Sequence, residues 1–374
     1  MINHFSAMMN STSSVGGACS NAGFTQNLFH SRHVKCEKVT NRLDELHEST
    51  RASTMQVRAV IVSCARNVEK DLKSSLAFLT GLGKHTSAFS VVIYEDSSTD
   101  GTRDQLRRWV TSGHSTHAKT AFFADPLMRA TRTQRLALCR NTIMHEAFSS
   151  SRISRTRGSK LPTIMVAVDL DCPHVLERVL PGFRDALGAM QPPESARFEV
   201  LTANSYPSYY DLWTIRSKQL LIDYDCWVGD ACSRTAQLPA EHCSPRPVGD
   251  PECVCAAGKE QVRRRGNCQS YQIFISPAAP LFAVEGGYSG LTLYNADAVE
   301  RTGCTFNGDE RCEIVPFQAC LRSRQLRIGL VPSLLQGCGA EHTLAANRTM
   351  LGKPRQNVFM SDKGAITYAT RIQK

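Results

Sequence analysis

The sequence has no long apolar run. No window offers the roughly 18 consecutive apolar residues that a membrane-spanning helix needs, and the N-terminal residues lack the continuous apolar core of a secretory signal. Paired Cys-x-x-Cys knuckles, which many structural zinc sites use, and internal repeats are also missing. We therefore expect no transmembrane anchor and no repeat array, and for the six cysteines between Cys226 and Cys268 we favour disulfides over zinc.

The composition is that of a folded protein, with 374 residues, 42% hydrophobic and 21% charged. The net charge of +10 comes from 44 Lys and Arg against 34 Asp and Glu. It suggests a polyanionic partner, which could be nucleic acid, a membrane surface or a phosphorylated small molecule. The 15 cysteines are an odd number, so a closed disulfide framework cannot use all of them. The redox compartment stays open.

Strand and helix patterns alternate along the middle of the chain. Buried-type strands are predicted at 57–67, 89–96 and 161–168, a helix at 131–148 and a loop at 149–160. This order predicts an α/β fold with a mixed, mainly parallel sheet and helices on both faces. We expect a flexible polar leader at 1–55, one main domain at 56–345 containing a Cys-rich insert at 226–272, and a polar C-terminal tail at 346–374.

The strongest chemical signal is an Asp-x-Asp at the end of the third strand. Alternation would place Asp169 and Asp171 on the same side of the chain, where two carboxylates favour a cation. Mg²⁺ or Mn²⁺ takes such oxygen ligands and can bridge to a diphosphate. The alternative is a solvated strand end or a helix cap.

Polar residues also follow the second strand. Asp96, in the run Glu95–Thr102, could accept a hydrogen bond from a ribose hydroxyl or a base, although the run could equally be a turn with capping residues. Cations and an amide on the following helix suit phosphate binding, or alternatively form a solvated helix face. These are Arg132, Arg135, Arg140 and Asn141.

Together these motifs resemble the GT-A class of nucleotide-sugar-dependent glycosyltransferases. More narrowly, RTQRLALCRN, TANSYPSYYDLW, PLFAVEGGYSGLTLYN and CEIVPF resemble the fungal capsule-associated α-mannosyltransferases and related microbial and viral glycosyltransferases. The resemblance covers about residues 57–342. It implies a metal-dependent transferase that moves a hexose, with mannose favoured, from a nucleotide-diphosphate sugar such as GDP-mannose to a glycan hydroxyl.

The resemblance also implies roles for particular residues. Asp171 would be the direct ligand of Mn²⁺ or Mg²⁺, Asp169 a second ligand or a contact to ribose or water, and His342 a late third ligand. Donor contacts would come from Arg66, Asp96, Arg132, Arg140, Asn141 and Asp169, and the sugar side would be lined by Asn204, Tyr210, Asp211 and Trp213. If configuration is inverted, Asp211 or Glu313 would be the catalytic base; if it is retained, no dedicated base is needed.

The chain departs from the family pattern in its last third. Ile314 follows Glu313, where the family usually has an acidic residue followed by His, and Gln318 stands where a second His is expected. The glycine-rich run 286–290 precedes an alternating LTLY segment instead of a helix, so it does not match a dinucleotide-binding loop. These departures leave the acceptor side and the role of Glu313 open.

Two other functions stay open at this point. The missing histidines would fit a catalytically inactive carbohydrate-binding relative, and the net charge would fit a nucleic-acid-binding protein, although no aromatic-rich binding motif accompanies the arginines. The family and the cysteines suggest the secretory-pathway lumen, such as the Golgi. A cytoplasmic location stays open as the alternative because no signal or anchor is visible. Three cysteines, Cys64, Cys139 and Cys172, are expected to act as small core residues.

Overall fold

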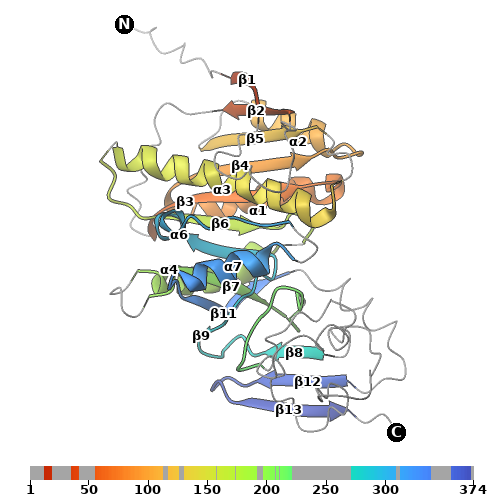
Figure 1. Cartoon of the computed structure of the whole chain (residues 1–374), viewed down its shortest axis with the longest axis vertical. Coiled ribbons are helices and arrows are strands. Elements are labelled where there is room, and N and C mark those ends of the chain that lie inside the picture. The colour runs from red at the N-terminus through yellow and green to blue at the C-terminus, as the bar shows by residue number, and fades with distance from the viewer. Residues whose placement is uncertain are drawn as a thin grey trace, which may run out of the picture. The chain divides into compact units, whose positions relative to one another are not determined.

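A computed structural model describes most of the chain between residues 12 and 371. The described residues are 12–18, 35–41, 55–112, 117–125, 130–156, 158–172, 174–191, 197–206, 208–209, 211–220, 271–308, 312–337 and 355–371. His342, Tyr210 and nearly all of the Cys-rich insert lie outside these ranges. The chain divides into two compact units (Figure 1). Unit 1 contains residues up to Asp171 with Asn295–Glu300, and unit 2 contains Cys172–Tyr294 and Arg301–Lys374.

Unit 1 is built on a mainly parallel sheet. Its strands lie in the order β1-β2-β5-β4-β3-β6. The four strands β5, β4, β3 and β6 run parallel, and β2 and β1 add to the edge in antiparallel fashion. The strand bounds are β1 Thr12–Ala18, β2 Lys35–Asn41, β3 Met55–Ala65, β4 Thr86–Asp96, β5 Ala118–Ala124 and β6 Thr163–Val168.

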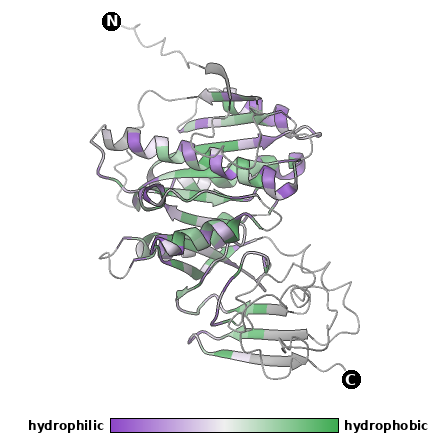
Figure 2. Ribbon diagram, in the orientation of Figure 1, coloured by the Kyte–Doolittle hydropathy of each residue, from purple (hydrophilic) through white to green (hydrophobic). Residues whose placement is uncertain are grey.

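The central strands form because their apolar, often β-branched runs are buried on both faces. Every residue of β6 is buried, as are most of β3 and β4, and these strands are largely coloured as hydrophobic in Figure 2. A strand that is covered on both faces reads as a continuous apolar run instead of an alternating one. The predicted α/β class with a mainly parallel sheet is confirmed.

Helices cover both faces of this sheet. The helix α1 (Glu69–Gly83) packs against β3 and β4, and α2 (Thr102–Thr111) packs against β2 and β5. The long helix α3 (Arg132–Thr156) packs across β3, β4 and β6 (Figure 1). Crossovers between parallel strands are right-handed. Since β6 lies on the opposite side of β3 from β4 and β5, α3 is placed on the face opposite α1 and α2.

The strand order reverses at β3, and this decides where a ligand can bind. From β3 the chain moves outward through β4 to β5 and then returns to β6 on the other side of β3. In open α/β sheets, ligands bind beyond the carboxyl ends of the strands at such a reversal. Arg66, Asp96 and Asp169 directly follow or end β3, β4 and β6, so they belong to this edge.

Unit 2 contains the four neighbouring strands β10-β7-β11-β9, in which β7 and β11 are parallel, and a separate three-stranded sheet in the order β13-β12-β8. Its helices are α4 (Leu176–Ala189) and α7 (Ile314–Ser323), and α6 (Ala296–Thr302) lies mostly within unit 1. The strand bounds are β7 Val200–Ser205, β8 Tyr271–Ile275, β9 Phe282–Ala283, β10 Leu291–Asn295, β11 Ile328–Gln336, β12 Arg355–Met360 and β13 Ile366–Arg371.

A glycine sets how closely α4 packs on β11. A Cβ atom on Gly182 would lie 2.1 Å from the backbone of Leu334, closer than any real contact. Only glycine therefore allows this helix to approach the strand.

The structure differs from the sequence expectations in several segments. The helix α3 continues through most of the predicted loop 149–160, to Thr156. The expected flexible leader contains β1 and β2, and β2 pairs with β5. The expected tail contains β12 and β13, which pair with each other and with β8. In each case pairing or packing with a distant segment supplies the stability that local polarity did not suggest.

The three cysteines that were expected to be simple core residues are all disulfide-bonded. Cys64 pairs with Cys139, and Cys172 is disulfide-bonded as well. In unit 2 a second described disulfide joins Cys304 to Cys320. Local apolarity could not distinguish a buried thiol from a disulfide, because the partner is distant in sequence.

Within the described part of the chain, no helix combines the length and the apolar character needed to cross a bilayer.

Candidate functional site

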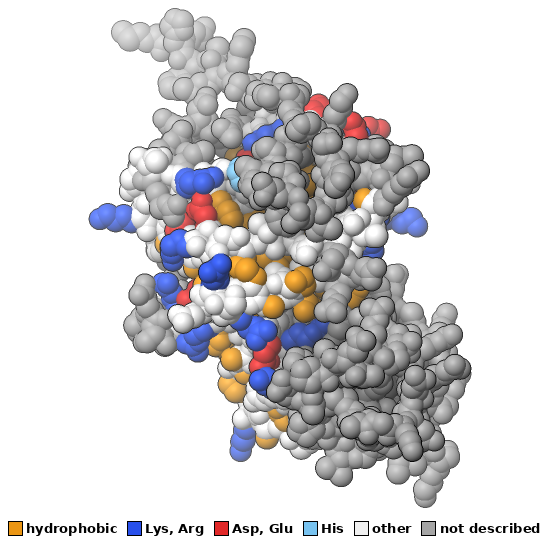
Figure 3. All heavy atoms as spheres, viewed as in Figure 1, with side chains coloured by type: hydrophobic (Ala, Val, Ile, Leu, Met, Phe, Trp, Pro, Cys, Tyr) orange, Lys and Arg blue, Asp and Glu red, His pale blue; other side chains and the backbone are white. Residues whose placement is uncertain are grey.

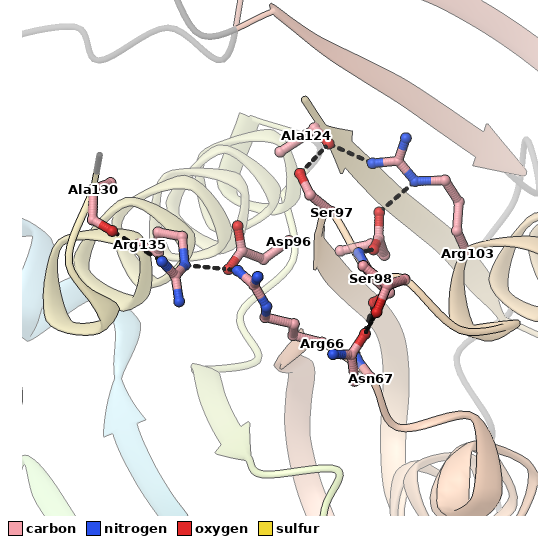
Figure 4. Close-up of polar contacts among 11 residues, drawn as sticks. Arg66, Asn67, Asp96, Ser97, Ser98, Arg103, Ala124, Ala130 and Arg135 are labelled. Carbon is pink, nitrogen blue, oxygen red and sulfur yellow. Dashed lines mark hydrogen bonds and ion pairs between the residues drawn. The ribbon is translucent and has the colours of Figure 1, made fainter. Parts of the chain in front are cut away.

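The loops after β3 and β4 interlock at the carboxyl edge of the sheet in unit 1 (Figure 4). The backbone N–H of Asn67 donates to Ser98 Oγ at 3.0 Å, and the backbone N–H of Thr99 donates to Asn67 Oδ1 at 2.8 Å. Asn67 and Ser97 adopt left-handed backbone conformations, with φ of 53° and 50°. Each loop therefore holds the other in a conformation that is uncommon for residues other than glycine.

The two loops also cap the helices that they lead into. Asp100 Oδ2 accepts from the N–H of Glu69 at the start of α1, and Glu69 Oε2 accepts from the N–H of Gly101 just before α2. Each carboxylate thus satisfies backbone donors at a helix N-terminus, where negative charge is also favoured. Desolvation is the largest single influence on the pKa of Asp100 and raises it, but the hydrogen bonds from Thr102 and from the N–H of Glu69 together outweigh it and lower the pKa below its ordinary value.

Glu95 is a fully buried structural carboxylate. It accepts from Arg103 Nε at 2.6 Å and from the backbone N–H of Ser98, and the same guanidinium donates to the carbonyl of Ala124 at the end of β5. A buried carboxylate without a partner would be strongly destabilising. The hydrogen bonds from Arg103 and from Ser98 therefore hold Glu95 and the turn after β4 in one conformation. Glu95 shapes the turn and is not exposed to a ligand.

Asp96, the neighbouring carboxylate, is shared by two arginines. Arg66 Nη1 and Arg135 Nε both donate to Asp96 Oδ2, each at 3.0 Å (Figure 4). Arg135 also donates from Nη1 to the carbonyl of Ala130 at 2.9 Å. The structure therefore brings together Arg66, Asp96 and Arg135, all of which the sequence suggested as nucleotide or phosphate contacts.

A helix cap explains why Arg135 reaches this position. Thr131 and Gln134 form a reciprocal capping box: the N–H of Gln134 donates to Thr131 Oγ1 at 3.2 Å, and the N–H of Thr131 donates to Gln134 Oε1 at 2.9 Å. The box starts α3 at Arg132 and places Arg135 in its first turns. The Thr-x-x-Gln spacing was the available sequence signal for this. Arg132 itself is exposed.

Asp169 and Asp171 follow β6 and alternate with a buried residue. Leu170 is 1% exposed and its carbonyl accepts from Ser75 Oγ at 2.9 Å, whereas Asp169 is half-buried and Asp171 exposed. The two carboxylates therefore lie on the less buried side of the loop, in line with the alternation argument. Arg140, which is buried on α3, places Nη2 3.9 Å from Asp169 Oδ1, while Asn141 beside it is half-buried.

The chemistry of this pair suits a hard divalent cation. Among the described residues, no group of three or more His, Cys, Asp or Glu side chains could enclose a metal ion. Mg²⁺ and similar ions are commonly bound by one or two carboxylates, with phosphate oxygens and water completing the shell. Asp169 and Asp171 fit that pattern, and the predicted third ligand, His342, lies outside the described residues.

The disulfide between Cys64 and Cys139 ties the same edge together. Cys64 is the penultimate residue of β3, two positions before Arg66, and Cys139 directly precedes Arg140 on α3. The bond therefore links the strand and the helix that carry the arginines of the site.

The residues predicted for the acceptor side fall in unit 2. Asp211 is half-buried and its Oδ2 accepts from Thr214 Oγ1 at 2.9 Å, while Glu313 precedes α7 and is only 3% exposed. Trp213 is half-buried. Asn204 does not line a sugar site as expected, because it is fully buried and its amide binds the backbone carbonyls of Ile275 and Pro332.

Gln318, the residue that replaces an expected histidine, has a structural role. Its side chain is fully buried and makes two hydrogen bonds of 2.7 Å, accepting from the N–H of Gly287 and donating to the carbonyl of Gly287. An amide matches both groups because it carries a donor and an acceptor together. The departure from the family pattern thus fixes the glycine-rich run 286–290.

Positive charge is scattered over the described surface. On the face drawn in Figure 3, Lys and Arg side chains are interspersed with acidic and uncharged ones. Many of the arginines in unit 1 are paired with carboxylates; these are Arg66, Arg103, Arg107, Arg135, Arg140 and Arg152. This distribution gives no support to the nucleic-acid-binding alternative, which would favour a continuous basic patch.

Comparison with known proteins gives distant likenesses. No protein-family model and no curated protein matches the chain. It is similar to a solved structure of the mannosyltransferase PcManGT from Pyrobaculum calidifontis in complex with GDP-Man and Mn2+, with 14% identity and a TM-score of 0.43 over 79% of this chain and 66% of that one. It is also similar to S. aureus TarS 1-349, with 11% identity and a TM-score of 0.39 over 78% of this chain and 64% of that one. The chain spans just under two thirds of the length of these proteins, and the likeness concerns the fold alone.

Proposed function

We propose that this chain is a metal-dependent glycosyltransferase that moves a hexose from a nucleotide-diphosphate sugar to a glycan hydroxyl. The observation that carries the proposal is the composition of one sheet edge in unit 1. Two carboxylates that suit a divalent cation follow β6, and guanidinium groups that suit phosphate or nucleotide groups occupy the neighbouring strand ends and α3. A nucleoside diphosphate is negatively charged, so its binding site needs positive groups and a bound cation. The guanidinium groups and the two carboxylates meet this need at the point where the strand order reverses.

Each group of this edge has a role in the proposed reaction. Mn²⁺ or Mg²⁺ bound by Asp169 and Asp171 would supply charge neutralisation at the donor diphosphate. Arg140, held near Asp169, would add positive charge where the leaving group gains negative charge. Arg66 and Asp96 would face the nucleotide, and Arg132 and Asn141 on α3 would extend the same surface.

The finer assignments also belong to the proposal. Mannose, with GDP-mannose as donor, is the favoured sugar, and His342 is the candidate third metal ligand. If the reaction inverts configuration, the base would be Asp211 or Glu313; the greater exposure of Asp211 favours it of the two. A retaining reaction would need neither.

The test is release of nucleoside diphosphate from GDP-mannose in the presence of Mn²⁺ and an oligosaccharide acceptor. We expect Asp171→Asn to reduce turnover at least about 100-fold, about 2.7 kcal/mol, and a chelator to abolish it until Mn²⁺ is restored. Asp104→Asn is the matched control, because Asp104 is an exposed carboxylate of α2 outside this edge, and it should leave turnover unchanged.

Two results would contradict the proposal. Undiminished turnover in Asp171→Asn and with chelator would exclude a metal-dependent transferase. Binding of nucleotide sugar without any release of nucleoside diphosphate, across donors and acceptors, would instead favour the inactive carbohydrate-binding relative.

A further inference from the structure

The cluster formed by Arg66, Asp96 and Arg135 presents guanidinium groups, and not a carboxylate, to solvent. The side chain of Asp96 is 11% exposed, whereas those of Arg135 and Arg66 are 23% and 41% exposed. Both described hydrogen bonds to Asp96 fall on the same oxygen, Oδ2 (Figure 4). A ligand that approaches this edge therefore meets N–H donors first.

The donors of the cluster are only partly used. A guanidinium carries five N–H groups. In the described part of the chain, Arg66 uses one of them, toward Asp96, and Arg135 uses two, toward Asp96 and the carbonyl of Ala130. Two positive charges against one negative charge leave the cluster with a net charge of +1. Such a group of donors suits a ligand that offers only acceptors, such as phosphate oxygens or the keto edge of a nucleobase.

The position of Asp96 explains what it does for the arginines. Arg66 comes from the loop after β3 and Arg135 from α3, so the two guanidinium groups come from different elements. Each guanidinium group lies 3.0 Å from the same oxygen, Asp96 Oδ2, so the two positive charges are close enough to repel each other. The carboxylate that they share offsets this repulsion. Without Asp96, nothing else described holds these two side chains together.

We infer that Asp96 is a positioning residue, and that Arg66 and Arg135 make the contacts to the bound nucleotide. This inference rests on the proposed function, since it takes the ligand to be a nucleotide. It reverses the role that the sequence suggests for Asp96, which is to accept hydrogen bonds from ribose or base. It keeps Arg135, which the sequence already suggested as a phosphate contact, and couples it to Arg66 through the shared carboxylate of Asp96.

The experiment measures binding of GDP to the full chain by calorimetry, with pyrophosphate as a second probe. Arg135→Gln should weaken GDP binding about tenfold or more, about 1.4 kcal/mol, and Arg135→Lys should recover part of the loss because it keeps the charge without the fork. If Arg135→Gln weakens pyrophosphate equally, the contact is to phosphate; if only GDP is affected, it is to the nucleoside. Both results support the inference.

A mutant cycle separates positioning from direct contact. Asp96→Ala should weaken GDP binding about tenfold in the natural chain but by less than about twofold when Arg66→Gln and Arg135→Gln are already present. Equal losses in both backgrounds would show that Asp96 touches the ligand and would overturn the inference. Unchanged binding in Arg135→Gln would overturn it as well.

Controls separate these outcomes from loss of fold and from failure of the proposed function. Arg107→Gln removes a different arginine–carboxylate pair of unit 1, that with Glu37, and should leave GDP binding unchanged. Thermal unfolding midpoints identify any variant that has lost its fold. If Arg135→Gln or Asp96→Ala does not fold, GDP binding is measured in Arg135→Lys and Arg66→Gln instead. If the natural chain binds none of GDP, UDP and pyrophosphate, the proposed function fails together with this inference; if it binds and the variants match it, only the inference fails.

Discussion

Removing the disulfide between Cys64 and Cys139 should destabilise unit 1 and loosen the candidate site. The two residues are 75 positions apart, with Cα atoms 6.1 Å apart. In the chain-entropy treatment, a crosslink that closes a loop of this length destabilises the unfolded chain by about 4.5 kcal/mol. The double variant Cys64→Ser with Cys139→Ser should lose about that much free energy of unfolding.

The second described disulfide provides a matched comparison. Cys304 and Cys320 are only 16 positions apart and lie in unit 2. The same treatment gives about 3 kcal/mol for a loop of this size. Cys304→Ser with Cys320→Ser should therefore cost less, and its effect should fall on a different unit.

Function should distinguish the two variants more sharply than stability does. Of these two disulfides, only Cys64–Cys139 joins the end of β3, next to Arg66, to the turn of α3 that carries Arg140. We expect GDP binding to weaken several-fold in the Cys64/Cys139 double variant under conditions where both variants are folded. The Cys304/Cys320 variant should bind GDP as the natural chain does.

The assay combines urea denaturation, amide hydrogen exchange and calorimetry. Exchange of peptides from β3, β4 and α3 reports on unit 1, and peptides from β11 and α7 report on unit 2. A loss below about 1 kcal/mol in the Cys64/Cys139 variant, or faster exchange in unit 2 alone, would refute the reasoning. A count of free thiols in the natural chain checks the premise.

Two further predictions concern buried polar groups. His117 is 4% exposed and stacks on Phe89, and burial, with the charges of Lys119 and Lys84, lowers its pKa to about 4 from an ordinary 6.5. Burial of the neutral imidazole therefore contributes fully to the free energy of unfolding above about pH 6.5, and this contribution falls by roughly 3 kcal/mol as the pH drops toward 4. Urea midpoints measured against pH should show a slope that His117→Phe reduces. Equal slopes in the two proteins would contradict this. Gln318→Leu should cost about 3 kcal/mol, because it leaves both backbone groups of Gly287 buried without partners; Gln318→Glu, which keeps an acceptor for the N–H, is the comparison in the same denaturation assay, and a loss under about 1 kcal/mol for Leu would count against this role.

The sequence by itself determined the class of fold and the ends of the strands that carry the site. Apolar runs of strand length alternate with helical patterns, and this local periodicity is sufficient to predict a parallel α/β sheet. Because parallel strands share one carboxyl edge, the order of the residues alone places Arg66, Asp96 and Asp169 at the same edge. The prediction worked because each of these residues directly follows or ends a strand.

Only the tertiary structure decided what those side chains contact. Asp96 and Arg135 are 39 positions apart, and Gln318 and Gly287 are 31 apart, so no local pattern encodes either pairing. The same holds for the Cys64–Cys139 disulfide and for the strands at both ends of the chain, which form by pairing with distant partners. A sequence pattern indicates whether a residue faces the core or the solvent, but the partner that it contacts depends on how distant segments pack. At this site the partner decides the role of Asp96: with two arginines bound to it, Asp96 holds them in place and does not itself face a ligand.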